Sequence, residues 1–580
     1  MLLSVALGLS AHEVRQERPL KDVSYVGSAA CKGCHPDHTA SWYRTFHRTM
    51  TQVATSASVL GNFDNAALTF DGVTSKFRRD GNHFIIETLD ATGKPRAYDI
   101  ERTVGSRRVQ QYVTREKDRF IRLPLAWDVA EKRWFHLNGG FLDPDGTDFN
   151  QHRALWDANC IFCHNVKAQP GYDWETARFD SHVAELGIAC EACHGPGAEH
   201  AALNRNPLRR YWLHATHAKD PSIVDPVRLA PLQRVQVCGH CHGQRLPNPP
   251  ERIRSLLSMG DPFTPGEDLS LYTVPIHRDS TLAGVDLTQR FWKDGTPRLT
   301  AYEYQALLMT RDFQAGGLTC EHCHALHGGD PRGMITKEMR GPQACASCHA
   351  AIVQNAAAHA KHRPGSSGTD CYACHLPKIV YGLMDVHPTH RISIPDPSRA
   401  WTYEMPDACT LCHLDKTAAW AEASLGRSAR PPPDAGFAVP ETLRALLSGD
   451  VVQRAVAVRA LGQGDLWTIP FFLLAMEDNY GAVRHFAVRG LRAVVERSAL
   501  AHPELAAGFA GLPRFEPQAD ASERARVLEV YRVWWAGTDK HAIPRPDPAV
   551  PLDAQLEPVR DTVRMLREKR RAQPEIQIGE

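Results

Sequence analysis

Cys31-Lys32-Gly33-Cys34-His35 is the stretch that decides how this chain is organised, because its pattern, Cys-x-x-Cys-His, occurs eight times in 580 residues. We number these motifs 1 to 8 in chain order. Their paired cysteines, which account for all sixteen in the chain, are Cys31 and Cys34, Cys160 and Cys163, Cys190 and Cys193, Cys238 and Cys241, Cys320 and Cys323, Cys345 and Cys348, Cys371 and Cys374, and Cys409 and Cys412. The histidines that follow them are His35, His164, His194, His242, His324, His349, His375 and His413.

The spacing within each motif has a chemical reason. Two thiols bond to two carbons on one edge of a porphyrin, and the next side chain turns beneath the ring to bind iron, which makes Cys-x-x-Cys-His the attachment sequence of c-type haem. Paired cysteines also form zinc sites and redox dithiols. Those sites do not require a histidine after every pair, and histidine is only 29 of the 580 residues. The motifs therefore predict eight covalently attached c-type haems, each with its iron.

Charge, hydropathy and haem chemistry limit the partners and the location of the chain. The 67 Lys and Arg residues nearly balance the 66 Asp and Glu residues, so we expect no nucleic-acid partner. No segment reaches the roughly 18 to 20 unbroken apolar residues of a transmembrane span, so we expect none in the mature chain. Haem is attached to cysteine outside the cytoplasmic membrane, which predicts a periplasmic or otherwise exported protein. Residues 1–23 fit a signal-peptide remnant with a flexible N-terminus, or an ordinary apolar N-terminus.

Residues 24–420 form the expected octahaem domain. Within it, residues 66–137 contain no cysteine and alternate apolar with polar residues between turn signals, which predicts a small inserted antiparallel β-sheet with strands near 83–88, 109–113 and 119–123. Motifs 2 to 8 follow one another too closely for each to have a domain of its own. We therefore expect short helices and loops that wrap closely packed porphyrins.

A helical domain is expected beyond the motifs. Residues 421–438 form a proline-rich linker, residues 439–572 contain apolar residues at helical spacing, and residues 573–580 are a tail. Within this domain Arg484–Leu491 repeats the pattern of Arg454–Leu461, which is typical of HEAT-like helical repeats. The predicted fold is thus mainly α with much irregular loop: a multihaem domain with a small inserted sheet, followed by a C-terminal α-helical HEAT-like domain.

The ligand on the far side of each iron separates two kinds of function. A second imidazole gives a six-coordinate iron suited to passing electrons, whereas an open position can bind a substrate. Position relative to the motifs favours as distal ligands His47, His152, His182, His200, His214, His327, either His359 or His362, and His390. Each could instead be an ordinary surface or core histidine, and Met50, Met309 or Met384 could take one position.

Several stretches together resemble a known family, the multihaem cytochromes c that are often fused to TPR or HEAT-type repeats. They are Tyr25–Ser28, Trp42 with His47, Gln110–Tyr112, Leu123–Asp128, Cys190–Gly197 and Cys371–Lys378. The resemblance covers roughly residues 24 to 420 and relates the chain to the tetrahaem nitrification cytochromes, nitrite reductase and octahaem hydroxylamine oxidoreductase. It implies parallel and perpendicular haem pairs in a conductive chain, with histidine as the usual distal ligand.

The function predicted from these observations is an octahaem cytochrome that relays electrons between redox partner proteins, with possible docking through the helical repeats. Nitrite reductases of the related group typically have a Cys-x-x-Cys-Lys motif, whereas every motif here ends in histidine. A multihaem oxidoreductase acting on a small nitrogen or sulfur compound at one five-coordinate haem remains an alternative. The resemblance would then imply a tyrosine crosslink, for which Tyr112, Tyr302, Tyr304 and Tyr381 rank equally. A third possibility is an interaction scaffold in which the repeats recruit partners.

Overall fold

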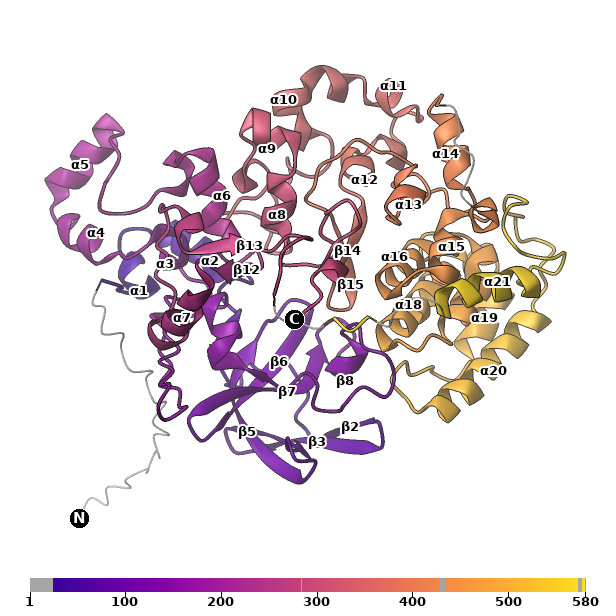
Figure 1. Cartoon of the computed structure of the whole chain (residues 1–580), viewed down its shortest axis with the longest axis horizontal. Coiled ribbons are helices and arrows are strands. Elements are labelled where there is room, and N and C mark those ends of the chain that lie inside the picture. Colours follow the sequence, from indigo (N-terminus) through magenta and orange to yellow (C-terminus); the bar gives the residue numbers. More distant parts are fainter. Residues whose placement is uncertain (1–23, 283, 428–433, 572–575, 579–580) are drawn as a thin grey trace, which may run out of the picture.

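The computed structural model describes residues 24–282, 284–427, 434–571 and 576–578. The expected signal-peptide remnant and residues 428–433 of the expected linker lie outside the described residues. Figure 1 shows three parts, which we call the sheet (β1–β9, residues 51–155), the motif region (residues 156–424) and the helical region (residues 435–571). Motif 1 precedes the sheet in the chain and runs from the last residue of α1 (Ser28–Cys31) through the turn that leads into α2 (Pro36–Tyr43).

The sheet has nine antiparallel strands. They are β1 (Thr51–Val53), β2 (Ala66–Phe70), β3 (Val73–Asp80), β4 (His83–Leu89), β5 (Pro95–Val104), β6 (Val109–Glu116), β7 (Arg119–Asp128), β8 (Arg133–His136) and β9 (Ala154–Leu155). Strands β2 to β8 follow one another in space as in sequence, while β1 pairs with β5 and β9 pairs with β7. This up-and-down order needs only tight turns, such as the one at Asp71 and Gly72, both of which have positive φ.

The predictions of a small sheet and a mainly α chain are corrected here. Alternate side chains of β4 are buried, as the sequence pattern indicated, and the buried face is rich in aromatic residues. Phe77 stacks on Trp134 with ring centres 3.7 Å apart, and Phe63 meets Tyr112 edge to face at 5.6 Å. This aromatic core supports a large antiparallel sheet that extends beyond residues 66–137 in both directions.

The motif region consists of short elements joined by loops. Its helices are α3 (Glu191–His194), α4 (Ala198–Leu203), α5 (Pro207–Thr216), α6 (Pro231–Gly239), α7 (Ile253–Met259), α8 (Glu303–Leu308), α9 (Arg311–Gly316), α10 (Gln343–Gln354), α11 (Ala356–Ala360), α12 (Cys371–His375), α13 (Arg399–Thr402) and α14 (Ala418–Ser424). Three two-stranded hairpins accompany them, β10 (Asn165–Val166) with β11 (Glu185–Leu186), β12 (Arg245–Pro247) with β13 (Thr273–Pro275), and β14 (Lys378–Gly382) with β15 (Asp385–Pro388). No described helix is both long and apolar enough to cross a membrane.

The helical region packs its helices tightly in pairs. They are α15 (Glu441–Ser448), α16 (Val451–Leu461), α17 (Ile469–Ala475), α18 (Gly481–Ser498), α19 (Pro503–Ala510), α20 (Ala521–Gly537) and α21 (Arg560–Arg571). Helix α16 begins with a capping box, in which the Asp450 carboxylate accepts from the Gln453 N–H at 3.0 Å. Helix α18 approaches α17 at Gly490, where a Cβ atom would lie 2.5 Å from the Phe472 ring. A larger residue there would push the two helices apart.

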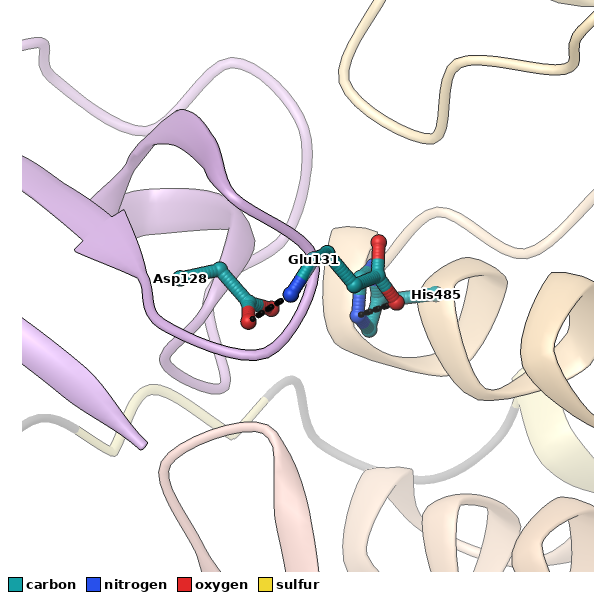
Figure 2. Close-up of side chains that lie close together, drawn as sticks. All are labelled: Asp128, Glu131 and His485. Atoms are coloured by element: carbon teal, nitrogen blue, oxygen red, sulfur yellow. Dashed lines mark hydrogen bonds and ion pairs between the residues drawn. The ribbon is translucent and has the colours of Figure 1, made fainter. Parts of the chain in front are cut away.

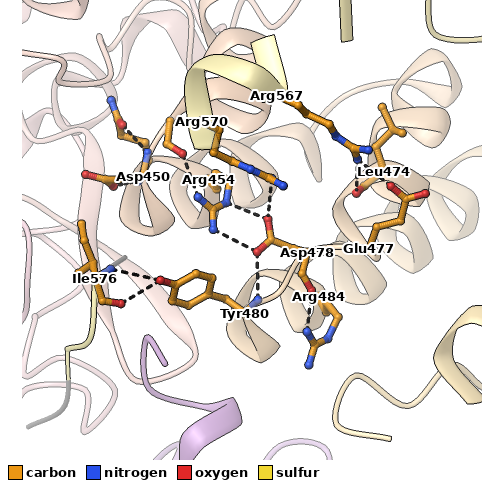
Figure 3. A network of polar contacts seen from close by, with 12 residues as sticks. Asp450, Arg454, Leu474, Glu477, Asp478, Tyr480, Arg484, Arg567, Arg570 and Ile576 are labelled. Carbon is orange, nitrogen blue, oxygen red and sulfur yellow. Dashed lines mark hydrogen bonds and ion pairs between the residues drawn. The ribbon is translucent and has the colours of Figure 1, made fainter. Parts of the chain in front are cut away.

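A buried polar network joins the helical region to the C-terminal end of the chain (Figure 3). The Asp478 carboxylate accepts from Arg454 at 2.8 and 3.1 Å and from the Tyr480 N–H at 3.0 Å. The Tyr480 hydroxyl in turn donates to the Ile576 carbonyl at 3.0 Å. Ile578 then pairs with Leu142 beside the sheet through two backbone hydrogen bonds of 3.1 Å. The described end of the predicted tail is therefore bound between the sheet and the helical region.

Candidate haem-binding sites

Imidazole rings from distant parts of the chain face the histidines of six motifs. Two imidazoles that bind one iron from opposite sides have ring centres about 6 Å apart, because each ligating nitrogen lies about 2 Å from the metal. The six pairs are His35 with His200 (6.2 Å), His194 with His327 (6.3 Å), His242 with His47 (6.2 Å), His324 with His390 (6.3 Å), His375 with His359 (6.1 Å), and His413 with His362 (6.0 Å). These residues fit the predicted cofactor.

Hydrogen bonds set the orientation of several of these rings. The Nδ1–H groups of His194, His324 and His375 donate to backbone carbonyls at 2.8 to 2.9 Å. Such a bond fixes the tautomer and leaves Nε2 available to a metal. On the opposite side of motif 1, Nδ1 of His200 lies 3.2 Å from a carboxylate oxygen of Asp220. The surrounding backbone therefore prepares these imidazoles for metal binding.

The predicted distal histidines fall into two groups. His47, His200, His327, His362 and His390 face motif histidines, and His359 and His362, between which the sequence left a choice, each face a different one. That these rings bind iron remains a prediction.

Three other predicted ligands lie elsewhere and do not stack on a motif histidine in the described chain. His152 is buried with Nε2 2.5 Å from the Asp143 carboxylate, and Nε2 of His182 lies 3.4 Å from Asp180. His214 lies on the exposed helix α5.

His38 shows why ring distance alone does not identify a ligand. It lies 6.1 Å from His35 and 4.5 Å from His327. It is only three positions after His35 in the chain, however, so the two rings cannot lie on opposite faces of one porphyrin. The 4.5 Å separation from His327 is too short for an intervening iron. His38 is therefore a side chain packed between the imidazole rings of His35 and His327.

The cysteines of successive motifs are neighbours in space. Contact with Cys190 together with burial raises the pKa of the Cys31 thiol, and contact with Cys320 together with burial raises the pKa of Cys238. Burial and the neighbouring Cys371 raise the pKa of Cys345 to about 12. These contacts connect motif 1 to motif 3, motif 4 to motif 5, and motif 6 to motif 7.

Weaker effects complete a row of motifs. The charge of Cys193 contributes to the raised pKa of Cys238 after Cys320 and burial, and that of Cys323 contributes to the raised pKa of Cys345 after burial and Cys371. Burial and then Cys412 raise the pKa of Cys374. The attachment sites therefore follow the order 1, 3, 4, 5, 6, 7, 8.

Motif 2 lies beside this row rather than within it. Contact with Cys163 together with burial raises the pKa of Cys241 in motif 4. Motif 2 is thus the second in the sequence but a side branch in space. The sequence gives no signal of this order, because it follows from contacts between segments that are far apart in the chain.

A cavity with suitable lining lies next to motif 7. It has a volume of about 460 Å³ and is lined by Arg332, Ile335, Met339, Arg340, Gly341 and Tyr372. Guanidinium groups bind carboxylates well, and apolar side chains cover an aromatic ring. Both arginines already pair with Asp330, so the apolar side chains are the part of this lining that suits a porphyrin.

A second cluster has the composition of a metal site but a different role. Asp128, Glu131 and His485 lie close together between the sheet and α18 (Figure 2). Arg489 donates to Asp128 at 2.7 Å and to Glu131 at 2.5 Å. Burial, and then Arg489 and Arg133, hold the pKa of His485 well below its usual value. Because arginines already supply the positive charge, the cluster joins the two parts of the molecule and does not suit a metal cation.

Comparison with known proteins bears on the motifs themselves. Residues 312–354, which contain motifs 5 and 6, match the protein family described as "Doubled CXXCH motif". This match supports covalent attachment of c-type haem at these motifs. No curated protein matches the chain.

Two solved structures resemble the chain distantly. The outer cell wall cytochrome OcwA is 18% identical, with 82% of this chain and 99% of that chain covered and a TM-score of 0.46. The undecahaem cytochrome from the S-layer of Carboxydothermus ferrireducens is 16% identical, with 88% and 69% covered and a TM-score of 0.31.

Proposed function

We propose that this protein is an octahaem c-type cytochrome that works outside the cytoplasm, as a periplasmic or otherwise exported protein, and relays electrons between redox partner proteins. The six facing imidazole pairs carry this proposal. Iron held by two imidazoles has no open position for a substrate and is suited to electron transfer. Each bound haem would supply a one-electron couple, and the chain positions and insulates these couples.

The row of attachment sites supports a relay with two ends. Adjacent cysteines belong to successive sites along the row, so neighbouring porphyrins would be in close contact. Cys34 in motif 1 and Cys412 in motif 8 are exposed, as is Cys348 in motif 6. The two ends of the row therefore lie near the surface, where a donor and an acceptor could dock. We assign partner docking to the helical region, with its paired HEAT-like helices, near motif 8.

The relay is tested on the mature protein. A mass equal to the processed chain plus eight haems, and mainly low-spin signals in low-temperature electron paramagnetic resonance (EPR), are the expected results. Stopped-flow reduction should then show all haems filling with electrons from one donor without a small-molecule substrate. A mass with fewer haems, or a population of haems that the donor never reduces, would contradict the proposal.

A second candidate is an oxidoreductase that acts on a small nitrogen or sulfur compound at one haem. The observation that favours it is His349 of motif 6, whose Nε2 atom lies 3.3 Å from a carboxylate oxygen of Asp312. Turnover of such a compound by the purified protein, with a high-spin haem that responds to it, would favour the enzyme. Electron transfer without turnover would favour the relay alone.

A further inference from the structure

His349 differs from the six paired motif histidines in what lies beside its Nε2 atom. Oδ1 of Asp312 is 3.3 Å away, at the first turn of α9. In motifs 3, 5 and 7 the Nδ1 atom is used by a backbone carbonyl, which leaves Nε2 as the atom that faces the iron. By the same orientation, the Asp312 carboxylate lies on the iron side of His349. It therefore approaches the nitrogen of His349 that would bind the metal.

The distance requires only a small adjustment. An iron bound by one nitrogen and one oxygen holds the two atoms about 4 Å apart, so the observed 3.3 Å must widen slightly. The side chains of His349 and Asp312 are 48% and 32% exposed, which leaves room for that movement. The backbone at Asp312 is held meanwhile, because the Thr310 hydroxyl caps the helix by accepting from the Phe313 N–H.

The geometry points to motif 6 as an exchangeable ligand site, in which Asp312 is the distal ligand and is displaced by a small neutral molecule with a nitrogen donor. A carboxylate suits haem iron less well than an imidazole does, so it holds the iron weakly. The negative charge of Asp312 disfavours anions that compete for the same position. The inference rests on the proposed octahaem assignment and locates, within it, a haem that binds small molecules.

Two variants of Asp312 test this site, with imidazole as the neutral probe and azide as the anionic one. In Asp312→His, a fixed imidazole should remove one high-spin haem equivalent from the EPR spectrum and abolish the optical response of that haem to imidazole. In Asp312→Ala, the high-spin haem should remain and bind imidazole about tenfold more tightly, as expected when a ligand that held the site roughly 90% of the time is lost. Azide affinity should rise by more than imidazole affinity, because a negative charge is removed.

A carboxylate on the surface of the helical region serves as the control. Asp561→Ala changes a carboxylate that is 83% exposed on α21, and it should leave both titrations unchanged. Identical high-spin signals and imidazole affinities in the wild type and both Asp312 variants would overturn the site. A haem count on the same samples separates this failure from failure of the relay. If eight haems are present and the Asp312 variants show no change, only the proposed ligand site is contradicted. If fewer than eight haems are present, the octahaem assignment is contradicted.

Discussion

Helices α10 and α16 are similar in length and both carry many small apolar residues, yet their surroundings are opposite. In α16, ten residues are buried and only Arg459 is not. In α10, which contains motif 6, no residue is buried. Helices α5, α7, α9 and α11 of the motif region likewise bury no residue, while every residue of α15 in the helical region is buried.

The difference shows where the core of each part comes from. The sheet buries its own aromatic side chains, and the helical region supplies most of a large apolar core that also includes motif-region residues such as Ile379 and Val380. Burial of these side chains favours folding of both parts. Several short helices of the motif region, by contrast, bury no residue. Their apolar faces need porphyrin rings, because a helix of this length is marginal in water without packing. We therefore expect porphyrin rings to form part of the core around these helices.

The largest expected effect is the loss of protection against hydrogen exchange when the chain is produced without haem. In a chain produced without haem attachment, hydrogen exchange at residues 198–216 and 343–360 should be at least about a hundredfold faster than in the mature protein. Exchange in α16 and in strands β4 to β7 should change far less, since these elements pack on buried side chains of the chain itself. Mass spectrometry of peptic fragments measures both. Equal acceleration in all regions would show that the regions share one core.

The next effect concerns the helical region alone. Asp478 and Arg454 have side chains only 1% and 4% exposed, so Asp478→Ala leaves a buried arginine without its anion (Figure 3). Loss of one partner of a buried pair typically costs about 3 to 5 kcal/mol of unfolding free energy. Thermal unfolding followed by circular dichroism should show an earlier transition of the helices, while the haem spectrum keeps its transition. A spectrum that shifts together with the helices would contradict separate cores.

A matched substitution on the surface serves as the control. Glu523 forms its ion pair with Arg526 on the exposed side of α20. Exposed pairs contribute little, since solvent screens them. Glu523→Ala should therefore leave the helical transition where it is in the wild type.

The sequence could predict what depends on local pattern. Each of the eight motifs is a short contiguous pattern that can be recognised without knowledge of the fold. The alternation of apolar and polar residues along β4, β6 and β7 predicts those strands in the same way. The sheet was underestimated because β1 and β9 are only three and two residues long, and their pairing with β5 and β7 depends on tertiary contacts.

Distal partners were harder to predict because they depend on distant segments. His200 faces His35 across a long stretch of chain that includes the whole sheet, so only residue type and rough position were available. His152 had the right type and spacing, but its carboxylate partner, Asp143, is visible only in the folded chain. Asp312 carried no signal at all, because a single aspartate in a loop-rich segment is not unusual.

A smaller effect tests the imidazole pairs within the motif region. His200→Ala and His362→Ala should each convert one haem from low spin to high spin, because each removes a ring that faces a motif histidine. His214→Ala, on the exposed face of α5, should leave the spin count unchanged. Low-temperature EPR on the three variants gives the result directly. An unchanged count in His200→Ala would remove that residue from the ligands.

The smallest expected effect is a shift in the reduction potential of the motif 1 haem, caused by a change at Asp220, which lies beside His200. Burial raises the pKa of Asp220, but hydrogen bonds from Ser222 and Asn204 and the charge of Arg209 outweigh it, so the pKa lies below its usual value. Asp220 is therefore ionised at neutral pH and supports the electron-rich form of His200 through Nδ1. That form favours oxidised iron.

Asp220→Asn should accordingly raise the reduction potential of the motif 1 haem, by up to about 60 mV, which is tenfold in a one-electron equilibrium. Potentiometric titration followed by EPR of that haem measures the shift. Asp64→Asn, in which the side chain is 82% exposed beside the sheet, is the control and should leave the potential unchanged. A potential that falls in Asp220→Asn would mean that the carboxylate acts on another group, because loss of a negative charge beside a ligating imidazole cannot stabilise the ferric state.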